Sequence, residues 1–182
     1  MNKSVYDSPT SSADINRHIL TVLVDNEPGV LARVIGMFSG RGYNIDSLNV
    51  AEVSNKHLSR ITIVTHGTNE VIDQIQSQLM RIVPVHSVTN LDQEDGSVEA
   101  EVALVHMFVN EDNKKNAFQV CDLYRARKIE NEHNSMIFEI AGTSERIDTF
   151  IKDISKITQI EIVRSDPVAI ASTNTQEEEI WE

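Results

Sequence analysis

Two segments of the chain that lie 75 residues apart carry nearly the same residues in the same order. When Gly67 is aligned with Gly142, residues 67–73 (GTNEVID) match residues 142–148 (GTSERID). Apolar and basic positions stay aligned at that offset through Val88 and Val163. A Gly-Thr helix start could recur by chance, but agreement over about twenty positions indicates a duplicated unit. We therefore expect two related domains.

The first half predicts the order β-α-β-β-α-β, which is the split arrangement of ferredoxin-like domains. Apolar runs rich in β-branched residues indicate strands at 18–24, 43–53, 57–66 and 84–91. Apolar residues at helical spacing indicate a first helix with Leu31, Val34, Ile35 and Phe38 on its buried face, and a second with Ile72, Ile75 and Leu79. Gly40 and Gly42 are expected to end the first helix, and Thr68 to cap the second.

The second half repeats this pattern. We expect strands at 98–109, 128–132, 135–142 and 159–163, one helix marked by Ala117, Val120, Cys121 and Tyr124, and another marked by Ile147, Phe150, Ile151 and Ile154. The predicted fold class is α+β, with two ferredoxin-like βαββαβ domains. The expected boundaries are a disordered tail at 1–16, a first domain at 17–91, a linker at 92–97, a second domain at 98–171 and an acidic tail at 172–182.

The charge of the chain excludes two classes of partner. A formal net charge of −12 argues against nucleic acid and against an anionic membrane surface, because both require clustered Lys and Arg. No apolar run is long enough to span a bilayer. The only cysteine, Cys121, excludes an internal disulfide and is expected to be an inert core thiol. The first residues resemble neither a signal peptide nor a transit peptide, so we expect a cytoplasmic protein.

The sequence gives little support for catalysis or for a bound metal. The six histidines are scattered, without the spacing of metal ligands, and are expected at the surface or at strand edges: His18, His57, His66, His86, His106 and His133. No Gly-x-Ser-x-Gly or Walker-type loop occurs. The glycines of GMFSGRG (36–42) fall at the end of a helix, whereas dinucleotide-binding glycines precede one. Tyr43 alone could stack on RNA bases from the central strands. We expect no catalytic residue and no metal ligand.

The turn at Pro28-Gly29 is the strongest candidate for a ligand site. A helix N-terminus carries unpaired N–H groups and a partial positive charge that attract a carboxylate. Gly29 lets a ligand approach the backbone, and Asn26 supplies an amide that suits a zwitterionic amino acid. Asn44, expected to begin the next strand, could supply a second polar contact.

A purely structural interpretation of this turn is also available. Asn26 would cap the helix, Pro28 would occupy its first turn and Gly29 would only relieve crowding. The second half argues against it, because the equivalent turn NEDNKK (110–115) repeats Asn-Glu but has no Pro-Gly. Gly29 is therefore not expected to be required by the architecture.

These residues also resemble a known family. NEPGVLARVIGMFSGRGYNIDSLNV (26–50), followed by LSRITIV (58–64), resembles the ACT domain of the small, regulatory subunit of acetolactate synthase (acetohydroxyacid synthase). A weaker likeness continues through QLMRIVPV, ALV and AGTSERIDTFI, so that it covers roughly residues 17 to 171. The resemblance makes the first domain an ACT domain.

The resemblance implies a non-catalytic subunit. It would bind and activate a large catalytic subunit that carries thiamine diphosphate, Mg²⁺ and FAD, and would confer feedback inhibition by valine, with leucine and isoleucine as the other candidates. Two ACT domains would pair as a homodimer with the effector at their interface. The implied effector-binding residues are Asn26, Pro28, Gly29, Val30 and Leu31 from one chain, with Asn44 and Ile45 from its partner.

The sequence departs from the family pattern mainly in the second half. Ala100 and His106 stand where the family often has Arg and Lys, and Arg164-Ser165-Asp166-Pro167 stands where it often has Arg-Thr-Gly or Arg-Ser-Gly. No contact to the catalytic subunit and no nucleotide site is therefore carried over. Two other functions remain open: a free-standing ACT-domain amino-acid sensor that regulates a different enzyme, and a small enzyme on a ferredoxin-like fold, such as a phosphatase.

Overall fold

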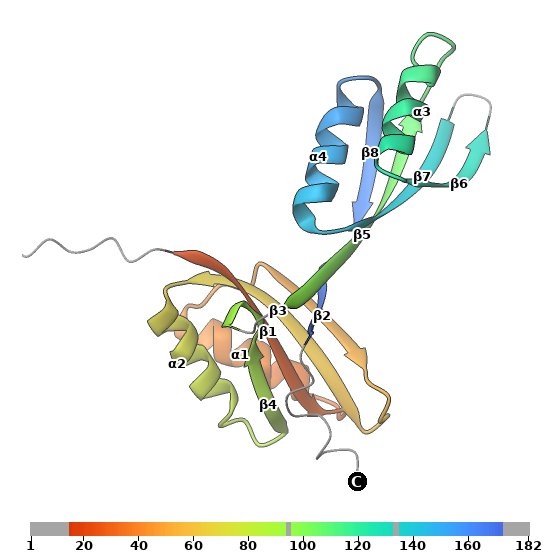
Figure 1. The fold of residues 1–182 in the computed structure, drawn as a ribbon. Helices are drawn as coiled ribbons and strands as arrows, with labels where there is room; N and C mark the ends of the chain where they lie inside the picture. Colours follow the sequence, from red (N-terminus) through yellow and green to blue (C-terminus); the bar gives the residue numbers. More distant parts are fainter. Residues whose placement is uncertain (1–14, 94–95, 133–134, 173–182) are drawn as a thin grey trace, which may run out of the picture. The chain divides into compact units, whose positions relative to one another are not determined.

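The computed structural model describes residues 15–93, 96–132 and 135–172. The chain divides into two compact units, with the main break after Asp92 (Figure 1). The expected tail at 1–16 and acidic tail at 172–182 lie almost wholly outside the described residues. Within the segment expected as a linker, Asp92 and Gln93 belong to the short 3₁₀ helix η1 (Leu91–Gln93) and Ser97 begins a strand.

The first unit has the β-α-β-β-α-β order predicted from the sequence. Its elements are β1 (Asn16–Asp25), α1 (Val30–Arg41), β2 (Ser47–Glu52), β3 (Leu58–Gly67), α2 (Asn69–Leu79) and β4 (Val85–Asn90). The strands form a four-stranded sheet in the order β2-β3-β1-β4, and β1 pairs antiparallel with both β3 and β4. This order is that of a ferredoxin-like sheet, so the predicted fold class is confirmed for this unit.

Alternation along the central strands builds the core of the first unit. Leu20 lies opposite Ile63 and Val22 opposite Ile61, and these four side chains are almost completely buried. The helices add fully buried residues at helical spacing: Val34 and Phe38 from α1, and Ile72, Ile75 and Leu79 from α2. Ile35 was predicted to join this core and does not, because Val30, Val34 and Phe38 form the buried stripe and Ile35 is 38% exposed.

The second unit repeats the fold and extends it by one strand. Its elements are β5 (Ser97–Phe108), α3 (Lys114–Leu123), β6 (Arg127–Glu132), β7 (Ser135–Gly142), α4 (Ser144–Ser155), β8 (Gln159–Arg164) and β9 (Val168–Ala171). The strand order is β6-β7-β5-β8, and β9, which the sequence did not predict, pairs with the first residues of β5. The fold class is therefore confirmed for both units, with β9 as an addition.

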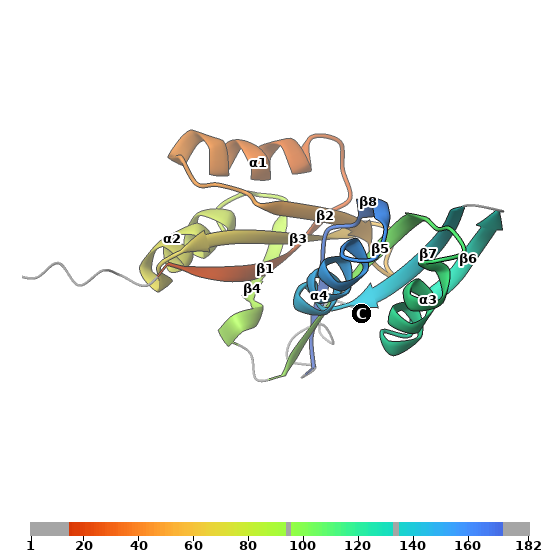
Figure 2. The same ribbon diagram turned by 90° about the horizontal axis from the view of Figure 1, so that it is seen from above.

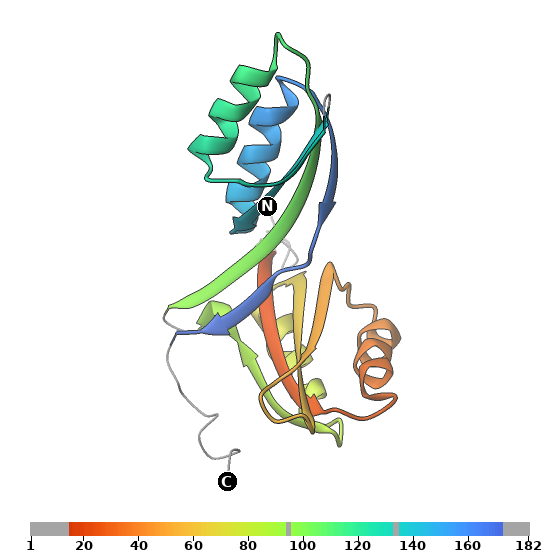
Figure 3. The same cartoon turned by 90° about the vertical axis from the view of Figure 1, so that its right-hand side faces the viewer.

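Helices α3 and α4 lie side by side on one face of the second sheet (Figure 3). Their buried residues Ala117, Cys121, Ile147, Phe150 and Ile154 pack against alternate residues of β5 and β7. Burial raises the pKa of the Cys121 thiol to about 12, so the thiol stays protonated at neutral pH. The expected place of Cys121 in the core is confirmed.

The helix caps explain the repeated Gly-Thr segments. Thr68 caps α2 by accepting a hydrogen bond from Val71 N–H at 3.4 Å, and Thr143 caps α4 by accepting one from Arg146 N–H at the same distance. Glu70 and Glu145 lie in the first turns, where the helix dipole favours negative charge. The duplicated sequence thus encodes the same helix start twice.

Candidate functional site

The turn before α1 leaves the N-terminus of that helix uncapped by a side chain. Gly29 is the N-cap, with φ 89° and ψ −6°, and the first helical residue is Val30. The first N–H groups of a helix have no partner one turn earlier, and here the cap has no side chain to offer them. Val30 N–H donates to the Glu27 carbonyl at 3.4 Å, and Arg33 N–H donates to the Gly29 carbonyl at 3.1 Å. The amides of Leu31 and Ala32, which lie between these two donors, are therefore the ones available to an anion.

Gly29 is required by the backbone and also leaves open space. Its φ lies in the left-handed region, where any residue with a Cβ is strained. A Cβ built at this position would meet nothing within 4 Å. The expectation that the architecture does not require a glycine here was therefore wrong for this turn, although the site is as open as expected.

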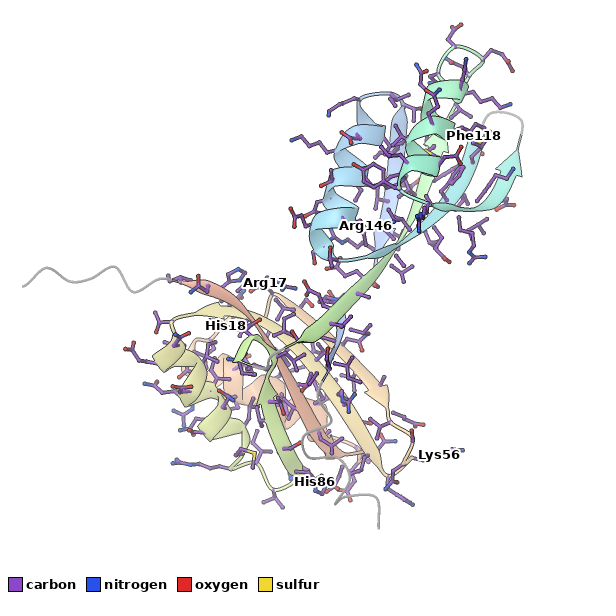
Figure 4. The ribbon with its side chains drawn as sticks, in the orientation of Figure 1. Arg17, His18, Lys56, His86, Phe118 and Arg146 are labelled. Atoms are coloured by element: carbon purple, nitrogen blue, oxygen red, sulfur yellow. The ribbon has the colours of Figure 1, made fainter. Side chains whose placement is uncertain are left out.

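The purely structural interpretation of the turn required Asn26 to cap the helix, and Asn26 does not do so. Its Nδ2 donates to Glu52 Oε1 at 3.1 Å and to the Lys56 carbonyl at 3.0 Å. Its backbone N–H donates to the His57 carbonyl at 2.7 Å. These bonds tie Asn26 to the end of the β2–β3 hairpin, which Lys56 marks in Figure 4. Because both donors of the amide are used, its Oδ1 remains as the acceptor. Pro28 lies in the exposed turn, two residues before the helix.

Asn44 lies at the other end of α1, in a segment that was expected to be strand. Strand β2 begins only at Ser47, so residues 43–46 form a connection without regular secondary structure, and the prediction of a strand start at Asn44 was wrong. The connection is held on β3, because the Thr65 hydroxyl donates to the Asn44 carbonyl at 2.7 Å and Asp46 N–H donates to the Val64 carbonyl at 2.9 Å. Asn44 Nδ2 donates to Asp46 Oδ1 at 2.6 Å.

The two groups of predicted site residues are separated by the length of α1. Asn26, Pro28 and Gly29 precede the helix, whereas Asn44 and Ile45 follow it. A helix of 12 residues is about 18 Å long. Figure 2 shows α1 extended along the first unit, with its ends at opposite ends of the unit. One chain therefore does not bring Asn44 to Gly29.

Aliphatic side chains lie beside the open turn. Val30 is buried in the core, and Leu31 is half-buried. Leu31 and Ile35 are four residues apart, so they share one face of α1, and that face is partly exposed. The sequence prediction placed Leu31 at the start of the buried stripe and therefore missed the exposure of Ile35. The buried stripe in fact starts at Val30 and continues through Val34 and Phe38.

The equivalent turn of the second unit is closed by its own side chains. Asn110 Oδ1 accepts hydrogen bonds from Asp112 N–H at 3.1 Å and Asn113 N–H at 3.0 Å, and Asn113 Oδ1 accepts one from Asn110 N–H at 2.8 Å. The N-cap of α3 is Asn113, with φ −100°, so this turn needs no left-handed residue. Neither helix has a side-chain cap on its own N–H groups, so the two copies differ in the turn itself: one turn is open at a glycine, and the other is bonded by its own asparagines.

Four of the described histidines each pair with a single carboxylate. In the part of the chain that the structure describes, no group of three or more His, Cys, Asp or Glu side chains could hold a metal ion. Four ring-to-carboxylate pairs occur, His18–Asp92, His66–Asp46, His86–Asp25 and His106–Glu161, at 3.1, 2.6, 2.7 and 3.9 Å. His18 is buried, contrary to the expectation of surface histidines, and its contact does not have hydrogen-bond geometry. His133 lies outside the described residues.

None of the helices within the described ranges is both long and apolar enough to cross a membrane.

Comparison with known sequences identifies the ferredoxin-like first unit as an ACT domain. Residues 20–87 match the model of the AHAS small subunit-like ACT domain, and residues 100–173 match that of the small subunit of acetolactate synthase. The acetolactate synthase isozyme 3 small subunit of Salmonella typhimurium is 39% identical, over 85% of this chain and 95% of its own. The small subunit of Buchnera aphidicola from Schizaphis graminum is 36% identical, over 85% and 98%.

A solved structure agrees with these sequence relatives. The acetolactate synthase small subunit from Thermotoga maritima superimposes with a TM-score of 0.79 at 34% identity, over 88% of this chain and 99% of that one. The chain belongs to the acetolactate synthase small-subunit family. It is the regulatory, non-catalytic part of that enzyme complex and acts in branched-chain amino acid biosynthesis.

Proposed function

We propose that this regulatory subunit binds the large catalytic subunit of acetolactate synthase, raises its activity and inhibits it when valine binds to the domain at residues 17–91. The catalytic subunit would carry thiamine diphosphate, Mg²⁺ and FAD. The observation that carries the effector site is the uncapped N-terminus of α1 at Gly29, which offers backbone N–H groups to a carboxylate.

Polar and apolar groups around this turn fit a branched-chain amino acid. The N–H groups of α1 would bind the carboxylate, and Asn26 Oδ1 would accept from the ammonium group. The partly exposed Leu31 and Ile35 would contact the aliphatic side chain. Pro28 would hold the turn at its fixed φ, and the buried Val30 would anchor the start of α1 to the core.

The length of α1 supports a homodimer. Asn44 and Ile45 follow the helix and cannot reach the Gly29 turn of the same chain, which is about 18 Å away. In a dimer related by a two-fold axis, the end of one α1 can lie beside the start of the other. Asn44 and Ile45 of one chain would then complete the site of the second.

The decisive experiment mixes the chain with its cognate catalytic subunit, measures acetolactate formation and titrates valine. We expect stimulation by the wild-type chain and inhibition by valine. A coupling of about 1–3 kcal/mol corresponds to about a 5- to 150-fold change in affinity. Gly29→Asp should abolish the response to valine, because its carboxylate would repel that of the effector. Asn44→Ala should weaken the response as well, while both variants still stimulate the synthase.

Two further variants separate charge from backbone strain. Asn and Asp tolerate positive φ to a similar degree, so Gly29→Asn carries the strain without the charge and should retain part of the response. Asn113→Asp places the same charge at the start of α3 in the second unit and should leave the valine response unchanged. Full inhibition in both Gly29→Asp and Asn44→Ala would refute the site, and absence of stimulation and of any valine response in the wild type would refute the function.

A further inference from the structure

Asp46 connects the candidate effector residue Asn44 to strand β3. One carboxylate oxygen, Oδ1, accepts from Asn44 Nδ2 at 2.6 Å, and the other, Oδ2, lies 2.6 Å from His66 Nδ1. The backbone N–H of Asp46 donates to the Val64 carbonyl at 2.9 Å. Both carboxylate oxygens and the backbone N–H of Asp46 are therefore engaged. Of Asn44, Asp46 and His66, Asn44 is the residue that belongs to the proposed site, and its side chain is exposed.

This contact determines which end of the Asn44 amide faces outward. A carboxylate only accepts hydrogen bonds, so the NH₂ group of Asn44 must point to Asp46 and its Oδ1 must point away. Without Asp46 the amide could turn by 180° and offer donors instead of an acceptor. A charge-assisted hydrogen bond of this length is among the stronger side-chain contacts and opposes that rotation.

Asn26 shows the same arrangement at the other end of the helix. Its NH₂ group is used by Glu52 and the Lys56 carbonyl, so that its Oδ1 is the free acceptor. The donors of the proposed site are then backbone N–H groups at the start of α1, and its acceptors are the two asparagine oxygens. Donors and acceptors are thus supplied by different parts of the site, as recognition of a carboxylate and an ammonium group requires.

We propose that Asp46 is a positioning residue of the effector site. It holds the side-chain amide of Asn44 with Oδ1 pointing outward, and the site thereby selects ligands that carry an α-ammonium group. The inference rests on the proposed function. A 2-oxo acid of the same carbon skeleton has no hydrogen to donate at that position, so it would leave the two acceptor oxygens without a partner. Loss of Asp46 frees the amide to turn and reduces this discrimination.

The test compares the dissociation constants of valine and of its 2-oxo analogue, 3-methyl-2-oxobutanoate, measured by calorimetry on the full chain. A site built to hydrogen-bond one ligand group commonly rejects an analogue without it by a large factor, so we expect the wild type to prefer valine by at least about 100-fold. Asp46→Ala should lower that ratio by about 10-fold, mainly through weaker valine binding. Asp46→Asn, which keeps the size but supplies a neutral acceptor, should lower it by about 3-fold.

Two controls separate orientation of the amide from general loosening of the segment. Thr65→Val removes the hydroxyl that holds the Asn44 carbonyl but leaves Asp46 and the amide untouched, so the ratio should not change. His66→Ala removes the second partner of Asp46 and should change the ratio by less than about 3-fold, because Asp46 N–H still anchors the segment.

The possible results distinguish failure of this inference from failure of the proposed function. A wild-type chain that binds neither valine nor another branched-chain amino acid would overturn the proposed function, and the inference with it. A wild-type chain that binds valine, together with an unchanged ratio in both Asp46→Ala and Asp46→Asn, would overturn the inference alone. An equal drop of the ratio in Thr65→Val would also overturn it. If Asp46→Ala does not fold, the isosteric Asp46→Asn variant decides between these results.

Discussion

The turns that start α1 and α3 occupy the same place in two copies of one fold and differ in how their hydrogen bonds are used. In the second unit, the side chains of Asn110 and Asn113 bond to backbone N–H groups of their own turn. In the first unit, the N-cap is a glycine without a side chain, and Asn26 bonds to the β2–β3 hairpin. The first turn is therefore stabilised from outside, and its glycine leaves open space at the start of the helix.

This difference shows how a duplicated fold can hold a ligand site in one copy only. Asparagines that bond within their own turn use its N–H groups and their own amide oxygens, which leaves fewer polar groups there for a ligand. An open turn must be supported from elsewhere, and the hairpin contact of Asn26 provides that support. The scaffold below both turns is the same, so substitutions at matched positions can test whether the difference lies only in the turns.

The largest effects are expected for substitutions in the matched cores. Leu79 in α2 aligns with Ile154 in α4, and both side chains are completely buried. Leu79→Ala and Ile154→Ala should each lower the free energy of unfolding by about 2–5 kcal/mol, through lost burial and a cavity. Chemical denaturation of each variant measures the change. Met80→Ala is the control, because Met80 is half-exposed and its loss should cost less than about 0.5 kcal/mol. A core substitution in one unit that costs under about 1 kcal/mol would break the equivalence of the two scaffolds.

Smaller and nearly equal effects are expected at the two threonine caps. Thr68→Ala and Thr143→Ala each remove one hydrogen bond to a helix N–H, at 3.4 Å in both cases. Each should lower the free energy of unfolding by about 1 kcal/mol, and Thr→Ser at either position should restore most of it. Urea denaturation measures both changes. Costs that differ between the two caps by more than about 1 kcal/mol would show that the repeated Gly-Thr segments are not equivalent.

Local rules predicted most of the fold. The repeat of residues 67–73 at 142–148 predicted two similar helix starts, and the structure has both. The spacing of apolar residues and the Thr68 cap were read from residues close together in the sequence, and the structure confirms them. Strand β9 escaped prediction because its four residues pair with the start of β5, far away in the sequence. Pairing at such a distance leaves no periodic signal in so short a segment.

The candidate site was predicted in outline and missed in its details. Pro28-Gly29 and the two asparagines were singled out from residue type and spacing, and their role stays a prediction. The left-handed conformation of Gly29 was missed because the second unit reaches a helix through a different turn conformation. The contact between Asp46 and Asn44 was missed because residues 43–46 were assigned to a strand. In a strand, residues two apart share a face but lie about 6.6 Å apart, which gives no reason to expect a bond between two short side chains.

The smallest changes in stability, and the sharpest contrast, are expected at Asn26 and Asn110. Asn110→Ala removes an acceptor of two backbone N–H groups and should lower the free energy of unfolding by about 1 kcal/mol. Asn26→Ala removes two exposed bonds whose partners, the Glu52 carboxylate and the Lys56 carbonyl, can bind water instead, so its cost should be about 0.5 kcal/mol or less. Denaturation midpoints measure both.

The response to valine should show the opposite order. Asn26→Ala should weaken inhibition of the synthase by valine at least about 5-fold, the lower end of ordinary allosteric coupling, whereas Asn110→Ala should leave it unchanged. The two substitutions remove the same side chain from equivalent turns, so a general loss of stability cannot produce this crossing of effects. Loss of the valine response in Asn110→Ala, or its full retention in Asn26→Ala, would mean that the ligand does not distinguish the glycine turn of the first unit from the asparagine-bonded turn of the second.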